Sequence, residues 1–121
     1  MARTTGKCGK AEVDYDDRCS YICVCEAGGK CSWSVTCPAP GGDTITTSGS
    51  GRETGGDGRP HFGYDGTAGM IGAELERISG YSVVVPEELR DERITGQIDG
   101  DMLAAAEKLG FSVTDKPASN T

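Results

Sequence analysis

Residues 71–85 read Ile71-Gly-Ala-Glu-Leu-Glu-Arg-Ile-Ser-Gly-Tyr-Ser-Val-Val-Val85, and this stretch decides the fold of the C-terminal half of the chain. Ile71, Leu75 and Ile78 recur at spacings of four and three residues, so they form one apolar stripe on a helix from about residue 68 to residue 79. Gly80 can end this helix in a left-handed conformation. The β-branched residues that follow favour a strand. The stretch therefore predicts a helix that leads directly into a strand.

Further strands and a second helix are predicted on either side of this stretch. Gly96 interrupts one of the strands and marks a bulge or a close approach of another group. Asp101 can cap the second helix, whose apolar face holds Met102, Leu103, Ala106 and Leu109. The predicted strands are residues 61–64, 81–85, 93–98 and 111–113.

The order of these elements, β, α, β, β, α, β, predicts the fold class. Each helix has only one apolar stripe to bury, so both are expected on one face of a small sheet. Residues 61–115 are therefore predicted to form an α+β unit. Residues 116–121 follow its last strand and are predicted to be a disordered tail.

This pattern resembles the secretin and TonB short N-terminal domain, a periplasmic module at the front of outer-membrane secretins and of TonB-dependent receptors that signal to regulators. The resemblance covers about residues 61 to 114 and depends on the segments 71–89, 93–98 and 102–111. It implies a domain that docks on another protein and performs no chemistry. A cysteine-rich hairpin is not part of the family pattern.

The first 38 residues hold all six cysteines and predict a β-hairpin module. Strand alternation about a turn at Gly28 places Cys25 opposite Cys31, and Cys19 opposite Cys37, so two cross-strand disulfides fit. Cys23 faces Trp33 and can reach back to Cys8, although six cysteines permit fifteen connectivities. Each bridge would stabilise this small module by about 2 to 4 kcal/mol. The candidate site residues are Cys8, Cys19, Cys23, Cys25, Cys31 and Cys37.

A zinc site and a thiol redox pair are the alternatives to disulfides. Tetrahedral zinc sites usually contain paired CxxC motifs, which this chain lacks, and its single histidine, His61, lies far from the cysteines in the sequence. A redox pair would need a CxxC at the start of a helix. We therefore expect no cofactor, with zinc as the alternative. Disulfides imply a periplasmic or exported protein, whereas a native start at Met1 would favour a cytoplasmic zinc protein.

Residues 39–60 are dominated by Gly, Ser and Thr and predict a linker. Alternating Thr and Ile in residues 43–48 can add one polar edge strand. Residues 49–58 are expected to be without order. The chain is thus divided into a cysteine-rich module (1–38), a linker or edge strand (39–60) and the α+β unit.

The clusters of acidic residues and the candidate nucleophiles are interpreted as structural rather than functional. The three aspartates in residues 14–17 and the two in residues 99–101 are interpreted as a solvated loop and a helix cap rather than calcium ligands. Glu74 and Arg77 are expected to be a surface pair. One histidine cannot serve every Ser or Cys nucleophile as a base, so we expect no enzyme.

Charge and hydropathy narrow the class of partner. The net charge is -7, and the excess negative charge lies beyond Pro40, which argues against nucleic acid and anionic membrane surfaces. No segment is apolar enough for membrane insertion. The sequence therefore predicts a non-catalytic protein-interaction or signalling module that docks on a protein partner through a sheet edge or face. The alternative is a small cytosolic zinc-binding regulatory protein.

Overall fold

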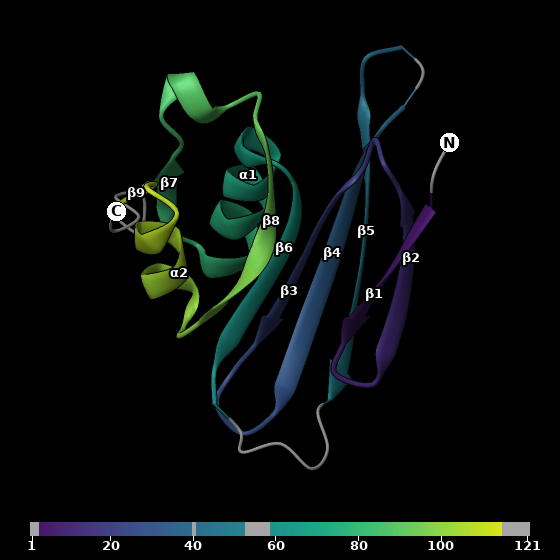
Figure 1. The fold of residues 1–121 in the computed structure, drawn as a ribbon, viewed down its shortest axis with the longest axis vertical. Helices are drawn as coiled ribbons and strands as arrows, with labels where there is room; N and C mark the ends of the chain where they lie inside the picture. The colour runs from purple at the N-terminus through teal and green to yellow at the C-terminus, as the bar shows by residue number, and fades with distance from the viewer. Residues whose placement is uncertain (1–2, 40, 53–58, 115–121) are drawn as a thin grey trace.

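The computed structural model describes residues 3–39, 41–52 and 59–114 and has an α+β fold, as predicted (Figure 1). The order of elements in the C-terminal half is also as predicted, with a 3-10 turn (η1) after the second of its strands. The elements of the described residues are β1 (Arg3–Cys8), β2 (Ala11–Asp16), β3 (Ser20–Cys25), β4 (Lys30–Pro38), β5 (Thr44–Arg52), β6 (His61–Thr67), α1 (Ala68–Ser79), β7 (Ser82–Val84), η1 (Glu87–Leu89), β8 (Arg93–Asp99), α2 (Met102–Lys108) and β9 (Ser112–Thr114).

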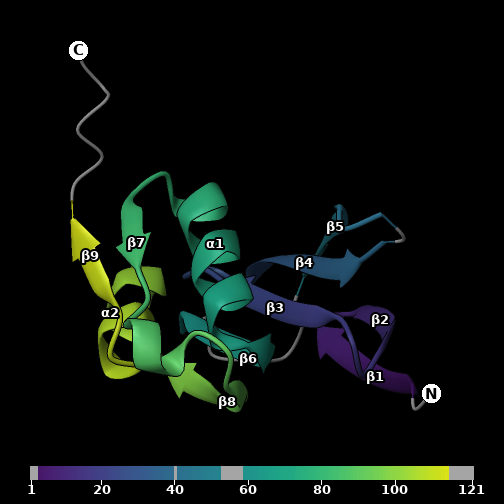
Figure 2. The ribbon, with the colours of Figure 1, turned by 90° about the horizontal axis from the view of Figure 1, so that it is seen from above.

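The main sheet has five antiparallel strands in the order β5-β4-β3-β6-β8. It joins the cysteine-rich hairpin, β3 and β4, to two strands of the C-terminal half. The strands β7 and β9 do not enter this sheet and pair with each other instead, so the expected single βαββαβ sheet is divided in two. Both helices contact the main sheet and the β7–β9 pair, which gives layers of sheet, helix and sheet (Figure 2).

The division of the sheet follows from the packing of α1 on two sides. Ile71 and Leu75 are fully buried toward the main sheet, as their spacing predicts. Gly72 lies on another side of the helix, where a Cβ atom would collide with the side chain of Val85. The absence of a side chain there lets the β7 segment approach the helix closely. The two helices on one face of the main sheet are thus covered by a second, smaller sheet.

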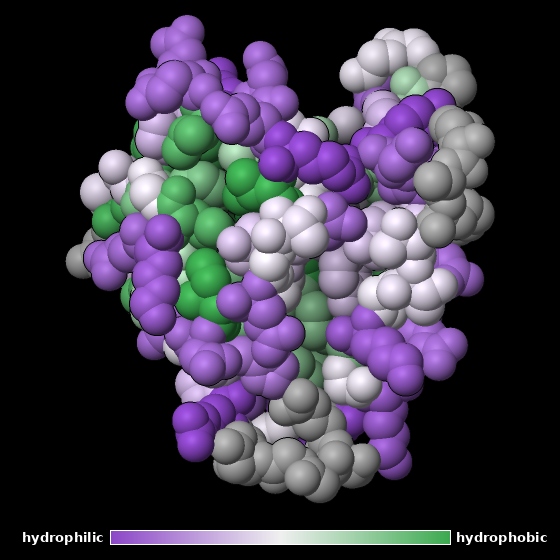
Figure 3. All heavy atoms as spheres, viewed as in Figure 1, coloured by the Kyte–Doolittle hydropathy of each residue, from purple (hydrophilic) through white to green (hydrophobic). Residues whose placement is uncertain are grey.

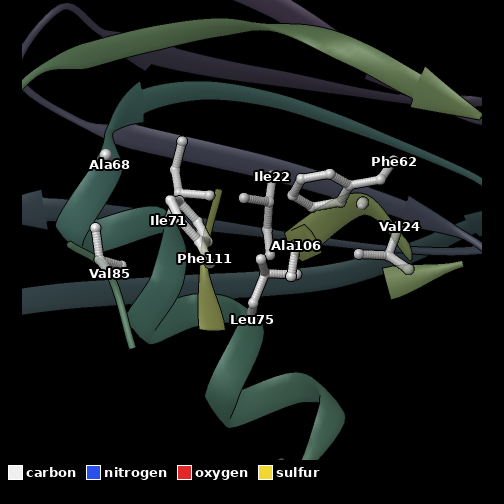
Figure 4. Packing of buried hydrophobic residues seen from close by; sticks show 10 residues of the cluster. Ile22, Val24, Phe62, Ala68, Ile71, Leu75, Val85, Ala106 and Phe111 are labelled. Carbon is white, nitrogen blue, oxygen red and sulfur yellow. The ribbon is translucent and has the colours of Figure 1, made fainter. Parts of the chain in front are cut away.

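One aliphatic core connects the N-terminal hairpin with the C-terminal half (Figure 4). Ile22 and Val24 of β3 project from the face of the sheet that carries the helices. They pack against side chains of β6, α1 and α2. The buried members of this core are Ile22, Val24, Phe62, Ala68, Ile71, Leu75, Val85, Ala105, Ala106 and Phe111.

A second core lies on the opposite face of β3 and β4, under the hairpin of β1 and β2. Its buried side chains are five of the six half-cystines together with Val13, Tyr15, Tyr21 and Val35, and the sixth, Cys37, is half-buried. The rings of Tyr15 and Tyr21 stack with centroids 5.0 Å apart. This hairpin therefore covers the N-terminal part of the sheet, as Figure 1 shows.

Residues 39–60 contribute the edge strand that the sequence offered as one possibility. The strand is longer than expected, because β5 pairs with β4 as far as Arg52. Gly49 lies against the ring of Trp33 and Gly51 against the backbone of Cys8, so small residues are required where disorder was expected. The backbone N–H of Lys10 donates to the carbonyl of Arg52 over 3.1 Å. Residues 53–58 and 116–121, also expected to lack order, lie outside the described residues.

Candidate interaction surface

The strand β8 forms one edge of the main sheet. It pairs with β6 over all seven of its residues, and no other described strand pairs with it. Its residues alternate between exposed and half-buried along the whole strand. An edge of this length presents a row of unpaired backbone groups to another chain.

The backbone hydrogen bonds at the two ends of the β6–β8 pair show which groups point outward. The N–H of Gly100 donates to the carbonyl of Pro60, and the N–H of Ala68 donates to the carbonyl of Glu92, both over 2.8 Å. In an antiparallel pair, hydrogen-bonded and non-bonded residue pairs alternate. When this alternation is followed along β8 from either end, the same residues of β8 are found to be hydrogen-bonded to β6. The backbone groups that point away from β6 are therefore those of Arg93, Thr95, Gln97 and Asp99.

The side chains of β8 divide between the two faces of the sheet. Ile94 and Ile98 are half-buried against the aliphatic core. Gly96 lies opposite Tyr64 in an uninterrupted register, and a Cβ atom there would come within 2.8 Å of the Tyr64 hydroxyl. Of the two roles expected for this glycine, the structure has the close approach and not the bulge. The residues with outward backbone groups have their side chains on the other face, where they are exposed.

A polar cluster around Asp65 holds β8 and the β1–β2 hairpin together. Thr95 donates its hydroxyl hydrogen to Asp65 Oδ1 over 2.7 Å, and Tyr15 donates to Oδ2 over 2.8 Å. The Arg93 guanidinium lies 3.3 Å from the same carboxylate. Burial acts to raise the pKa of Asp65, but the hydrogen bonds from Thr95 and Tyr15 and the Arg93 charge outweigh it, so the pKa is lowered. The carboxylate stays charged and fully bonded, which suits a structural anchor.

The face of the sheet opposite the helices is hollowed beside the β1–β2 hairpin. The hollow has a volume of about 300 Å³ and includes Lys7, Tyr21, Asp65, Thr95 and Gln97 in its lining. Burial raises the pKa of Tyr21 to about 12. Its hydroxyl is buried without a hydrogen-bond partner among the described residues. This polar face adjoins the open edge of β8.

Glu74 is buried, which corrects the expectation of a surface pair with Arg77. Its side chain is 3% exposed, and neither carboxylate oxygen has a well-formed hydrogen bond within the described part of the chain. Burial raises its pKa to about 7, although Ser34, Thr36 and the Arg77 charge act in the other direction. Arg77 donates instead to the Ser34 hydroxyl over 2.7 Å. The cause is that α1 covers β4, a strand expected in a separate module.

The six cysteines form three disulfides, and the hairpin register is as predicted. Cys25 lies opposite Cys31 and Cys23 opposite Trp33. The bonded pairs are Cys8–Cys23, Cys19–Cys37 and Cys25–Cys31. The last two are the cross-strand pairs that strand alternation predicts, and Cys8–Cys23 is the pairing that the sequence named as possible but left open. Disulfides of this density are typical of proteins from an oxidising compartment.

The alternative use of the cysteines, zinc binding, depends on the same sulfur atoms. The Sγ atoms of Cys8, Cys23 and Cys25 all lie within 4.8 Å of one another. Zinc binds the thiolate form of cysteine, and each of these sulfurs is part of a disulfide. A zinc site here would therefore require reduction of two bridges. The single histidine, His61, does not belong to this group of sulfur atoms, and its Nδ1 atom lies 3.2 Å from the carbonyl oxygen of Arg59.

The surface of the molecule is mixed in character (Figure 3). Apolar side chains gather on the side of this view that carries the helices, and hydrophilic residues surround them. No helix in the described ranges combines the length and the apolar character that a membrane crossing requires.

Comparison of the chain with protein-family models, with curated proteins and with solved structures gives no match.

Proposed function

We propose that the protein is a non-catalytic protein-interaction or signalling module that binds an extended segment of a protein partner along β8. The observation that carries this proposal is the open seven-residue edge of the main sheet. Strand addition to such an edge gains main-chain hydrogen bonds, and side chains on both faces supply specificity. The segment would continue the order β5-β4-β3-β6-β8 by one strand.

Two features of the chain support this assignment. The resemblance of residues 61–114 to the secretin and TonB short N-terminal domain implies a docking module. The polar groups nearest to the edge, around Asp65, bond to one another and tie β8 to β6. A rigid edge loses less entropy when a partner binds. The cystine core beneath the adjoining strands adds to this rigidity.

The proposed location is periplasmic or otherwise exported. The three disulfides support it, because the cytosol keeps most thiols reduced. The net charge of -7 favours a protein partner over nucleic acid. In this setting the cysteines stabilise the fold and bind no metal.

The test is a selection of peptides from a random display library against the folded protein. We expect the selected peptides to slow hydrogen exchange at the backbone amides of Thr95 and Gln97. The variant Gln97→Pro removes an outward N–H, at a position where an edge strand tolerates proline. Each peptide should bind this variant roughly tenfold more weakly, the cost of one hydrogen bond and a ring clash.

A matched control is available on the opposite edge of the sheet. Hydrogen bonds from Ala39 to Asp43 and from Lys10 to Arg52 show that Ser48 of β5 also directs its N–H outward. Ser48→Pro should leave peptide binding unchanged. Peptides that bind Gln97→Pro as tightly as the wild-type protein, or that protect amides elsewhere only, would contradict the proposal.

A further inference from the structure

The sequence of β8 is complementary to itself in the antiparallel direction. The strand reads Arg93-Ile-Thr-Gly-Gln-Ile-Asp99. When the strand is paired with an antiparallel copy of itself and the two Gly96 residues face each other, Arg93 lies opposite Asp99 of the copy, Ile94 opposite Ile98 and Thr95 opposite Gln97. We propose that β8 binds β8 of a second copy of this chain in this register, and that the two copies form a symmetric dimer with one continuous sheet.

The backbone phase of β8 agrees with this register. The groups that point away from β6 belong to Arg93, Thr95, Gln97 and Asp99. With Gly96 on the twofold axis, every one of these residues lies opposite another member of the same set. Each such pair can then exchange two backbone hydrogen bonds, as antiparallel pairing requires. A register displaced by one residue would place outward groups opposite inward groups.

The side chains on the two faces match as well. On the helix face, Ile94 and Ile98 are half-buried at the margin of the aliphatic core, and each would cover the other across the twofold axis. On the opposite face, Arg93 lies opposite Asp99 of the second copy, twice in the dimer. Opposite charges in directly opposed positions stabilise a strand pair. The Arg93 guanidinium also bonds within its own chain, to the carbonyl of Asp17 over 2.9 Å and to Asp65 over 3.3 Å, so in the dimer Asp99 of the second copy shares it with these groups.

The other long edge, β5, lacks these properties. Reversed about its central residue, Ser48, it places Ile45 opposite Gly51 and Thr44 opposite Arg52. Neither pair joins two apolar side chains or two opposite charges. One terminal outward carbonyl is occupied on each edge, that of Arg52 by the Lys10 N–H over 3.1 Å and that of Asp99 by Lys108 Nζ over 3.4 Å, so the side-chain pairs decide between the two edges. The self-complementary edge is therefore β8.

This inference rests on the proposed docking function, because both use the same edge, and it names the second copy as a partner. A strand pair of this length buries little area, at the lower end of specific interfaces, below about 1,200 Å². The dissociation constant of the dimer is therefore expected to be roughly 1 to 100 μM, so the dimer forms above this concentration and dissociates below it. A weak dimer of this kind protects the edge and yields it to a tighter partner.

Sedimentation velocity over a range of protein concentrations tests the dimer with the intact chain. We expect a monomer–dimer equilibrium in which Asp99→Arg raises the dissociation constant roughly tenfold, because it opposes Arg93 with a like charge at two symmetric positions. Asp43→Arg changes the net charge equally but lies beyond the other edge, and it should leave the constant unchanged. Circular dichroism and native disulfide mapping verify that each variant is folded.

Oxidative cross-linking tests the register. A mixture of Thr95→Cys and Gln97→Cys proteins should form a heterodimeric disulfide, whereas each variant alone should not, because these two positions face each other only when Gly96 lies on the axis. A protein that stays monomeric to millimolar concentration would overturn the inference. So would a dimer that Asp99→Arg does not weaken, or cross-links in either variant alone. If peptides still bind the β8 edge in any of these cases, the docking function stands without the dimer.

Discussion

Replacement of Glu74 by Gln should change how the stability of the protein depends on pH. Glu74 is 3% exposed on α1, between the helix and β4, and burial raises its pKa to about 7. A carboxyl group in the unfolded chain has the ordinary value of 4.5. Glutamine has nearly the same shape but does not titrate, so the substitution isolates the cost of the charge.

The sign and the size of the effect follow from proton linkage. Because the folded-state pKa is raised, the contribution of Glu74 is most favourable below pH 4.5 and is lost as pH rises through about 7. The difference between about 7 and 4.5, at about 1.4 kcal/mol per pH unit, corresponds to roughly 3 kcal/mol. We therefore expect Glu74→Gln to become more stable than the wild-type protein at pH 8, relative to pH 4, by about this amount.

Urea unfolding at several pH values, with the disulfides intact, measures this difference. The free energies of unfolding of the two proteins should diverge between pH 4.5 and pH 8. Glu107→Gln, on the exposed surface of α2, is the control and should follow the wild-type curve. If the curves of wild type and Glu74→Gln stay parallel over this range, Glu74 is not a buried, desolvated carboxyl group.

Two further predictions concern the groups that hold the sheet together. Asp65→Asn should lower the free energy of unfolding at pH 7 by about 1 to 3 kcal/mol, because it weakens the bonds to Thr95, Tyr15 and Arg93. Since the pKa of Asp65 is lowered, its contribution is present above the ordinary value and is lost as pH falls, so the difference from wild type should shrink in acid; a constant difference would argue against the cluster. Removal of Cys19–Cys37 by two serine substitutions should cost about 1 kcal/mol more than removal of Cys25–Cys31, because the sequence separations are 18 and 6 residues. Chemical denaturation of the two double variants measures this, and equal losses would refute the chain-entropy argument.

Local patterns in the sequence were sufficient for the elements of the C-terminal half, for β3 and β4 and for the cysteine register. They were not sufficient for β1 and β2, because residues 14–17 were expected to form a solvated loop and Asp14 to Asp16 instead belong to a strand. The stripe of Ile71, Leu75 and Ile78 predicted α1, because helical periodicity is visible within a dozen residues. Strand alternation about Gly28 placed Cys25 opposite Cys31 for the same reason. Both inferences use only neighbours in the chain.

The order of strands in the sheets was not accessible in this way. The pairing of β3 with β6 joins residues about forty positions apart, and no local pattern specifies such a contact. One signal was available, however. Ile22 and Val24 alternate with Cys23 and Cys25, so both faces of β3 are apolar, which is typical of a central strand. The burial of Glu74 follows from the same missed pairing, because it places β4 beneath α1.

The candidate surface depended on strand order too. Thr95 and Gln97 look like ordinary polar residues of a strand, and only the position of β8 at the end of the sheet gives their backbone groups a role. The phase of the hydrogen bonds, which decides that these residues point outward, required the bonds at Pro60 and Glu92. A docking edge is thus a property of topology rather than of composition.

The two faces of β3 belong to two different cores, cystine and aromatic on one side and aliphatic on the other. If either core lost its order, the other core would lose the strand against which it packs. The halves of the described chain should consequently melt in a single transition, with equal calorimetric and van't Hoff enthalpies. Reduction of the disulfides near the N-terminus would then also destabilise the strands at the opposite edge of the sheet.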